Sequence, residues 1–314
     1  MWTIALESIY IALNDDPFPT QHACISRQLA VFEDVQQLSR HLIKPDGPER
    51  PLATLDVADL FEHAWASFSN DGYDHSVSLV ERRLRLSGLD EKFFKGKMCF
   101  DGGCGSGRLS IAMAAMNASE VVAADLGQAS LDYLQRQAAR RSTGTIKPTQ
   151  CDVTDLRGGP DATFDFVASY GVLHHTPNPL GGLREHFRVL KPGGTLWLYL
   201  YGAGGIYWDV YDQLRDVIGK FSVSHVKAAL SDMKVREGLC YTFLDNVLAP
   251  SQYYLESDII AFLRKDDPGL VWRRATGSSV VDDVDMSLAT KHGKEIIGPE
   301  GEVRVVVTKS RQME

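Results

Sequence analysis

The eight residues from Asp101 to Arg108, DGGCGSGR, constrain the fold of this chain more than any other segment. They follow a short apolar run, Met98 to Phe100, and precede Leu109 to Ala114, a stretch of helical character. Three alternating glycines let a ligand approach the backbone closely, because glycine has no Cβ atom. A helix N-terminus also presents amide N–H groups that have no partner within the helix. The segment therefore predicts a strand-to-helix turn that holds a nucleotide-like small molecule.

The spacing of these glycines narrows the kind of nucleotide. A phosphate-binding P-loop needs Gly-Lys followed by Ser or Thr, and the pairs that begin at Gly96, Gly219 and Gly293 lack that residue. A dinucleotide fingerprint needs G-x-G-x-x-G, and its third glycine is replaced by Arg108 or by Ser110, depending on where the count starts. An NAD(P)-dependent oxidoreductase is therefore disfavoured, but it is kept as an alternative. A non-catalytic subunit that binds an adenosyl ligand is the other alternative.

Acidic residues also follow the next two expected strands. The run Val121–Asp125 ends in a carboxylate, and Asp152 comes shortly after the run Ile146–Gln150. The two oxygens of a carboxylate at a strand end suit the two hydroxyls of a ribose. Enzymes that use NAD share this feature, so it predicts an adenosyl ligand without saying which one.

Several segments together resemble one enzyme family. The pattern D-x-G-x-G-x-G from Asp101 to Gly107 resembles motif I of the class I S-adenosylmethionine-dependent methyltransferases. Phe164–His175 resembles the fourth-strand segment of the ubiquinone-biosynthesis-type group. Phe187–Leu196 resembles the helix end, Pro-Gly-Gly turn and fifth strand of the same group. The segments occur in the order and spacing of the family, over roughly residues 95 to 201.

The resemblance implies S-adenosyl-L-methionine as cofactor and assigns residues to it. In the family, the residue at the position of Asp125 meets the ribose, and the one at the position of Asp152 accepts a hydrogen bond from the adenine amino group. The segment Asp71–His75 resembles the one that covers the methionine end of the cofactor. The cofactor-binding residues expected on this basis are Tyr73, Asp101, Gly103, Gly105, Gly107, Asp125, Leu126, Asp152, Val153 and Tyr170.

His174 and His175 follow the fourth strand and are the predicted catalytic residues. Histidine titrates near neutral pH, so either side chain can serve as general base for the methyl acceptor. We favour His175 because it lies farther into the loop. The alternative is that the pair braces the loop. No metal is expected, because two adjacent histidines need further ligands and no carboxylate follows nearby in the sequence.

Aromatic residues gather in and just after the fifth strand. Their rings predict a surface for a planar or cationic small-molecule substrate. The alternative is that they form the core of a helical cap. The residues assigned to the substrate are Tyr201, Tyr207, Trp208 and Tyr211.

The alternation of strands and helices between residues 94 and 202 predicts an α/β fold with a doubly wound, mostly parallel sheet. By resemblance the sheet has seven strands, as in the Rossmann-like methyltransferase fold, and its last strand is antiparallel. We expect a helical N-terminal segment and lid at 1–93 and the cofactor-binding core at 94–202. A helical cap at 203–267 and C-terminal strands at 268–314 complete the chain.

Composition limits the partners. A net charge of −8 argues against a broad nucleic-acid surface, which needs a basic face. The five cysteines show no paired C-x-x-C spacing, so neither a zinc cluster nor a disulfide framework is expected, and we infer a reducing compartment. Met1 to Leu13 lacks the basic leader of a signal peptide, and no apolar run is long enough to span a membrane. We therefore expect a cytoplasmic enzyme with a small-molecule substrate.

Overall fold

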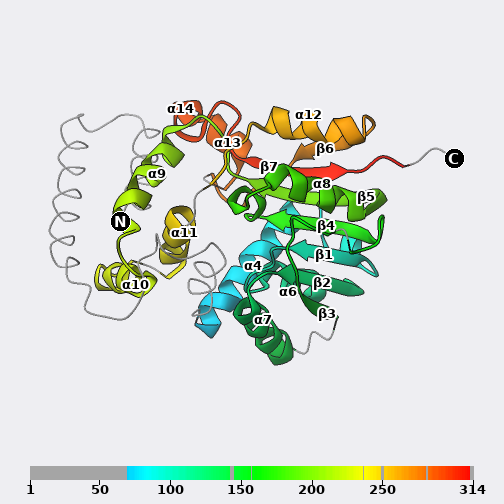
Figure 1. Ribbon diagram of the computed structural model, residues 1–314, viewed down its shortest axis with the longest axis horizontal. Coiled ribbons are helices and arrows are strands. Elements are labelled where there is room, and N and C mark those ends of the chain that lie inside the picture. Colours follow the sequence, from blue (N-terminus) through cyan, green and yellow to red (C-terminus); the bar gives the residue numbers. More distant parts are fainter. Residues whose placement is uncertain are drawn as a thin grey trace.

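The computed structural model describes residues 69–141, 145–156, 158–235, 237–248, 251–280 and 282–311. These residues contain a seven-stranded sheet with the strand order β3-β2-β1-β4-β5-β7-β6 (Figure 1). The strands are β1 (Met98–Gly102), β2 (Glu120–Asp125), β3 (Ile146–Gln150), β4 (Phe164–Tyr170), β5 (Leu190–Leu200), β6 (Val271–Arg274) and β7 (Val303–Thr308). Strands β1 to β5 are parallel, and β7 is antiparallel to both β5 and β6. The predicted α/β fold with a seven-stranded, mostly parallel sheet is confirmed.

Helices cover both faces of the sheet because successive strand residues point to opposite faces. Phe166 and Ala168 of β4 face α4 (Asn70–Leu86), α6 (Arg108–Ala115) and α7 (Gln128–Arg141). Val167 faces α8 (Pro179–Val189) and α12 (Glu256–Asp266). The short helix α5 (Glu91–Phe94) precedes β1 and adds Phe94 to the first face. Figure 1 shows the resulting three layers.

The predicted Pro-Gly-Gly turn is part of strand β5. Helix α8 ends at Val189 and β5 begins at Leu190, with no separate loop between them. The pairing of β4 with β5 shifts register before Thr195, and Gly193 adopts φ +74° there. The chain therefore passes from α8 directly into β5, whose first residues pair irregularly with β4. Lys309, just after β7, donates hydrogen bonds to the carbonyls of Phe187 and Leu190 and so caps the end of α8.

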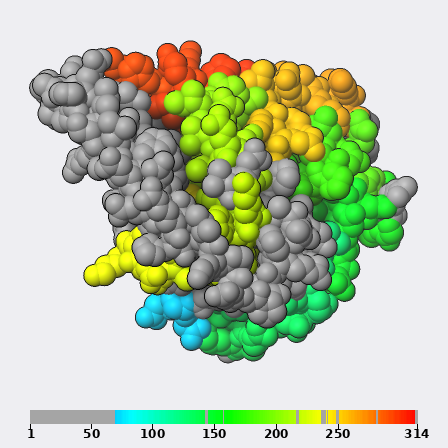
Figure 2. All heavy atoms as spheres, turned by 60° about the vertical axis from the view of Figure 1, so that its left-hand side comes forward, coloured from blue at the N-terminus to red at the C-terminus, as the bar shows by residue number. Residues whose placement is uncertain are grey.

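A separate helical group, which we call the cap, consists of α9 (Ile206–Ile218), α10 (Val223–Asp232) and α11 (Glu237–Leu248). Figure 1 shows it beside the sheet, and in Figure 2 the orange-red residues of α13 (Val284–Leu288) and α14 (Gly293–Ile297) lie above it. The cap has its own apolar core. Helix α12 lies within the range 203–267 expected for the cap, yet its apolar side belongs to the core of the sheet.

A buried carboxylate ties α4 to the segment between β6 and β7. Asp282 is 7% exposed, accepts a hydrogen bond from Arg83 Nε at 2.7 Å and also pairs with Arg304. Arg304 in turn pairs with Glu302 at 2.7 Å. Burial alone would raise the pKa of Asp282, but the two guanidinium groups hold it well below its usual range. This cluster fixes α4 against the strands that end the sheet.

Replacing Asp282 by Asn should lower the free energy of unfolding by about 3 kcal/mol, because two partly buried guanidinium groups lose their carboxylate. Since the folded pKa is depressed, this contribution is present above the unfolded value of about 3.9 and is lost as the pH falls below it. Urea denaturation at pH 7 and pH 3 measures both effects. The control is Asp266→Asn, which breaks an exposed pair with Arg184. It should cost about 0–1 kcal/mol. Equal losses in the two variants would contradict the prediction.

Candidate active site

The glycine loop joins β1 to α6 at the carboxyl edge of the sheet. Gly103 has φ +79°, and a Cβ atom there would overlap the side chain of Val172. Gly105 has φ +51°, and a Cβ atom there would meet no atom of the described residues within 4 Å. Packing therefore requires glycine at 103, whereas at 105 the backbone borders open space. A ligand can approach the loop closely at this second position.

Asp125, the last residue of β2, braces this loop. Its Oδ2 atom accepts a hydrogen bond from the Gly105 amide at 2.7 Å, and Oδ1 accepts one from the Gly127 amide at 2.9 Å. The carboxylate is partly exposed, and the next side chain, Leu126, is 52% exposed. A carboxylate has about four lone-pair sites, and its oxygens are the acceptor type that suits hydroxyl donors. The site thus combines an open backbone, a carboxylate and an exposed apolar side chain.

The turn after β3 lies next to the end of β2, because the Cys151 amide donates to the Asp125 carbonyl at 3.0 Å. Asp152 is exposed, and its Oδ1 atom accepts hydrogen bonds from the amide and hydroxyl of Thr154 at 2.8 and 2.7 Å. This local pattern is the usual way in which Asp stabilises a turn. Val153 is 5% exposed. Both carboxylates expected to meet the adenosyl group therefore lie at adjacent strand ends.

Two other predicted cofactor residues point into the protein and support the loop. Asp101 is 2% exposed and accepts a hydrogen bond from the Ser110 hydroxyl at 2.6 Å, while burial raises its pKa to about 7. Tyr73 of α4 is fully buried, and its hydroxyl donates to the Ser106 carbonyl at 2.7 Å. These bonds connect the loop to α6 and α4. Direct contact of either side chain with a ligand stays a prediction.

The two histidines lie in the short 3-10 helix η2 (Leu173–His175) after β4. His174 is fully buried, and its ring centroid is 3.8 Å from that of Tyr201. Neither of its ring nitrogens has a hydrogen-bond partner among the described residues, and burial holds its pKa well below the usual range. His175 is 6% exposed, and its Nδ1 atom lies 3.2 Å from the Ser251 hydroxyl. His174 is therefore neutral at pH 7, which makes it a weak base.

The four predicted substrate residues join β5 to the cap. Tyr201 and Trp208 stack with centroids 3.7 Å apart. Asn246 of α11 accepts a hydrogen bond from the Tyr201 hydroxyl at 3.2 Å and donates one to Tyr207 at 3.0 Å. Trp208 is 3% exposed and Tyr211 is fully buried, as in the alternative interpretation of these rings as cap core. Their role in binding a substrate is untested.

Tyr170 and Tyr199 line the same end of the sheet. Tyr170 stacks on Trp197 with centroids 4.3 Å apart and contacts Tyr199 at 5.1 Å. The Tyr199 hydroxyl donates to Glu302 at 3.1 Å, and the Arg304 guanidinium lies 4.4 Å from the centre of the Tyr199 ring. Charged side chains from the C-terminal segment therefore reach the region that the histidines face.

Sequence reasoning missed one further carboxyl group, that of Asp245 on α11. It is partly buried and interacts with Arg108, the first residue of α6, and with Tyr201. Burial raises its pKa to about 7, against the attraction of the Arg108 guanidinium. The signal in the sequence is a single acidic residue, next to Asn246, in the otherwise apolar segment 243–247.

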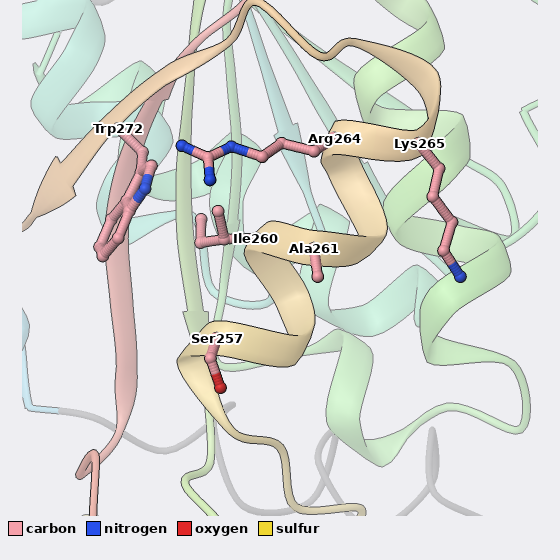
Figure 3. A pocket seen from close by; sticks show the side chains of 6 residues that line it. All are labelled: Ser257, Ile260, Ala261, Arg264, Lys265 and Trp272. Atoms are coloured by element: carbon pink, nitrogen blue, oxygen red, sulfur yellow. The ribbon is translucent and has the colours of Figure 1, made fainter.

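A hollow on the outer side of α12 lies away from this site (Figure 3). Its lining residues come from α12 and β6, and β6 is the edge strand at the opposite end of the sheet from β3. In Figure 3 Arg264 extends toward Trp272, whereas Lys265 points away from it. The hollow is thus separated by strands β7 and β5 from the loops that follow β4, β1 and β2.

Comparison with known proteins places this geometry in a family. Residues 100–198 match a family described as a methyltransferase domain. The 27-O-demethylrifamycin SV methyltransferase of Amycolatopsis mediterranei is 31% identical over 190 residues, which cover 57% of this chain and 69% of that protein. The ubiquinone biosynthesis O-methyltransferase of Pseudomonas fluorescens is 34% identical over 115 residues, or 36% of this chain. The match spans about half of that relative, 49% of its length.

A solved structure shares the fold. It is described as a complex between the Haloferax volcanii Trm112 methyltransferase activator and a putative methyltransferase, with a TM-score of 0.51 and 16% identity. The match covers 82% of this chain and 99% of that one. The antiparallel β7 between β5 and β6 also differs from the 3-2-1-4-5-6 order of dinucleotide-binding folds.

The chain belongs to the class I S-adenosylmethionine-dependent methyltransferases, and its cofactor is S-adenosylmethionine. The open backbone at Gly105, the partly exposed carboxylate of Asp125 and the exposed Leu126 suit an adenosyl ligand with a ribose. Membership of this family disfavours the alternative of an NAD(P)-dependent oxidoreductase. In the part of the chain that the structure describes, no helix combines the length and apolar character needed to cross a membrane.

Gly105→Val should abolish cofactor binding and leave the protein folded, because the new side chain fills open space above the loop. The positive φ should cost about 1–2 kcal/mol of stability. Calorimetry with S-adenosylhomocysteine measures binding, and thermal unfolding measures folding. Gly96→Val is the control, since Gly96 also has a positive φ and open space around it but lies before β1. A Gly105→Val protein that binds normally would remove this loop from the cofactor site.

Proposed function

We propose that this protein transfers the methyl group of S-adenosylmethionine to an oxygen atom of a small molecule. The observation that carries the proposal is the open backbone of Gly105 between the carboxylate of Asp125 and the exposed Leu126. The relatives support the acceptor class, because one is named as an O-methyltransferase of ubiquinone biosynthesis and the other methylates a 27-O-demethyl compound by its name.

We assign the ribose hydroxyls of the cofactor to Asp125 and the adenine amino group to Asp152. Leu126 and Val153 would lie against the adenine ring, and the backbone of residues 103–107 against the methionine part. Tyr73 would hold the loop through its bond to Ser106. S-adenosylmethionine supplies a methyl group that its sulfonium already activates. The protein therefore has to align an acceptor, remove its proton and exclude water.

The position of the cap suits the exclusion of water from the site. Its aromatic core packs against Tyr201 at the end of β5 and so covers the region beyond the histidines. His175 remains our candidate base of the pair, since it keeps a polar neighbour in Ser251 while His174 is enclosed by rings. We place the protein in the cytoplasm, where thiols stay reduced. Its acidic net charge argues against nucleic acid as the acceptor.

Binding of S-adenosylhomocysteine should raise the melting temperature of the protein, whereas NADH should not. Asp125→Ala should weaken that binding, because each hydrogen bond to a charged group is worth about 1.5–3 kcal/mol. The same change frees the amides of Gly105 and Gly127, so some loss of stability is expected as well. Calorimetry gives the affinity of the folded variant. The control is Asp132→Ala, an Asp of α7 on the protein surface that bonds only Gln128 among the hydrogen bonds of described residues. Unchanged affinity in Asp125→Ala would remove this residue from the site.

His175→Ala should reduce turnover by about 10²–10⁴-fold if the side chain is the general base, and leave the affinity for S-adenosylhomocysteine nearly unchanged. His174→Ala should chiefly lower stability, because it opens a void beneath the Tyr201 ring. Turnover is measured with labelled S-adenosylmethionine, and folding by thermal unfolding. Full activity in both variants would leave the pair as a brace for the loop.

A further inference from the structure

Strand β6 is an outer edge of the sheet, because its only strand neighbour among the described residues is β7. The amide of Ala275, just after β6, donates to the Arg304 carbonyl at 2.7 Å. Hydrogen-bonded residues alternate along an antiparallel pair, so Arg273 turns its amide and carbonyl to β7, whereas Trp272 and Arg274 turn theirs outward. Neither outward amide has a hydrogen-bond acceptor among the described residues. The edge therefore offers backbone groups to a further strand.

A hollow of about 490 Å³ lies beside this edge and is lined by residues of α12 and β6 (Figure 3). Trp272 packs with the apolar residues of α12, and Arg274 pairs with Glu256 of the same helix at 3.3 Å. Both side chains therefore lie on the α12 face of β6. The Arg273 guanidinium instead bonds the carbonyl of Ser87, at the end of α4 on the opposite face. A residue that pairs with Trp272 from outside would direct its side chain to the α12 face as well, into the hollow.

The charges at the hollow leave it positive in a chain whose net charge is −8. Two lining residues, Arg264 and Lys265, have no ion pair among the described residues, and in Figure 3 Arg264 extends toward Trp272. Asp258 of α12 is exposed but does not line the hollow. The other acidic side chains nearby are already engaged: Glu256 and Asp285 with Arg274, Asp266 with Arg184, and Glu300 with the Ser257 hydroxyl. The hollow is therefore complementary to an added negative charge.

We propose that β6 binds an extended segment of a partner protein, which adds as an antiparallel strand and places a carboxylate side chain in the hollow beside Arg264. The partner residue opposite Trp272 would exchange two N–H···O bonds with it, and antiparallel pairing is the more stable arrangement. A small acidic molecule would fill the hollow but leave the outward backbone groups unpaired. The open edge thus favours a peptide chain. This binding would be independent of methyl transfer.

A second copy of this chain suits the edge less well. A two-fold axis at β6 would bring Arg264 and Arg273 of one copy near the same residues of the other, and opposed like charges are destabilising. Charged side chains of this kind protect edge strands from pairing with themselves. The same arginines attract an acidic segment. Val271, which is 69% exposed on the face of Arg273, would gain cover from a residue next to the carboxylate.

A fluorescein-labelled peptide with blocked ends, Thr-Val-Glu-Val-Thr, is the probe. Its Glu can pair with Trp272 and reach Arg264, while its valines lie on the face of Val271. The peptide should bind the full chain with a Kd below about 1 mM by fluorescence anisotropy. The affinity for S-adenosylhomocysteine should stay unchanged. A second peptide carries an N-methyl group on the Glu amide and so loses its donor to the Trp272 carbonyl. It should bind about fivefold more weakly.

Two neighbouring variants test the hollow. Arg264→Glu should weaken binding of the Glu peptide by about fivefold or more, because attraction becomes repulsion. It should bind the peptide Thr-Val-Lys-Val-Thr better than the wild type does. The matched control is Lys265→Glu, which makes the same charge change on the same helix with a side chain that points away from Trp272. It should alter the affinity by less than about twofold, since salt screens an exposed charge. Thermal unfolding checks that both variants fold.

Hydrogen exchange follows the edge residue by residue. In the free protein the amides of Trp272 and Arg274 should exchange faster than that of Arg273, which is bonded to β7. Saturating Glu peptide should slow the two outward amides selectively. Slow exchange of these amides in the free wild type, increasing with protein concentration, would place a second copy on the edge and overturn the proposal.

The other results also decide the matter. No binding of the Glu peptide at about 1 mM would overturn the proposal. Equal binding of the N-methylated peptide would overturn strand addition and leave the hollow as a site for a small acidic ligand. Equal losses in Arg264→Glu and Lys265→Glu would overturn the role of the hollow.

Discussion

The carboxylate of Asp125 accepts hydrogen bonds from two backbone amides, those of Gly105 in the glycine loop and Gly127 after β2. Because the residue ends β2 and the loop leaves β1, these bonds fix the distance between the two neighbouring strand ends. The amide of Cys151 donates a hydrogen bond to the carbonyl of Asp125, which joins the turn after β3 to the same strand end. Three parallel strands thus present their carboxyl ends as one rigid edge. Any ligand of the glycine loop meets this preformed edge.

The site also depends on support from outside the sheet. Tyr73 of α4 binds the loop from one side, and α4 is held by Arg83 and Asp282. The cap reaches the same edge through Tyr201, whose ring and hydroxyl have different partners. On the proposed cofactor side, the glycine loop is bound to the end of β2 by a contact between residues 20 apart in the sequence, and a distant segment adds support through α4. The proposed acceptor side is built by contacts between elements far apart in the sequence.

That difference explains which features could be predicted from the sequence. The loop from Asp101 to Arg108, the strand ending in Asp125 and the antiparallel last strand are local patterns or follow from the family's order of segments. The burial of His174 could not be predicted, because it depends on the ring of Tyr201 from another strand. Asp245 was missed for the same reason, since only the fold brings α11 near the charges of Arg108 in α6 and Glu302 before β7. From the sequence alone, the rings of Trp208 and Tyr211 could form a substrate surface or the core of the cap. Their low exposure depends on how the cap packs, which the sequence does not give.

The contact between Arg83 and Asp282 spans 199 residues of the chain. Closing so long a loop carries a large entropic cost, and contacts of this separation form slowly in folding. The pair that joins α4 to the C-terminal segment can therefore form only after the strands beside Asp282 have joined the sheet. The apolar side of α4 packs in the same core as α6 and β4, within the first half of the sheet. The support that Tyr73 gives the glycine loop is thus built by the N-terminal strands and reinforced by the last ones, so the far end of the chain contributes to the stability of a loop near its middle.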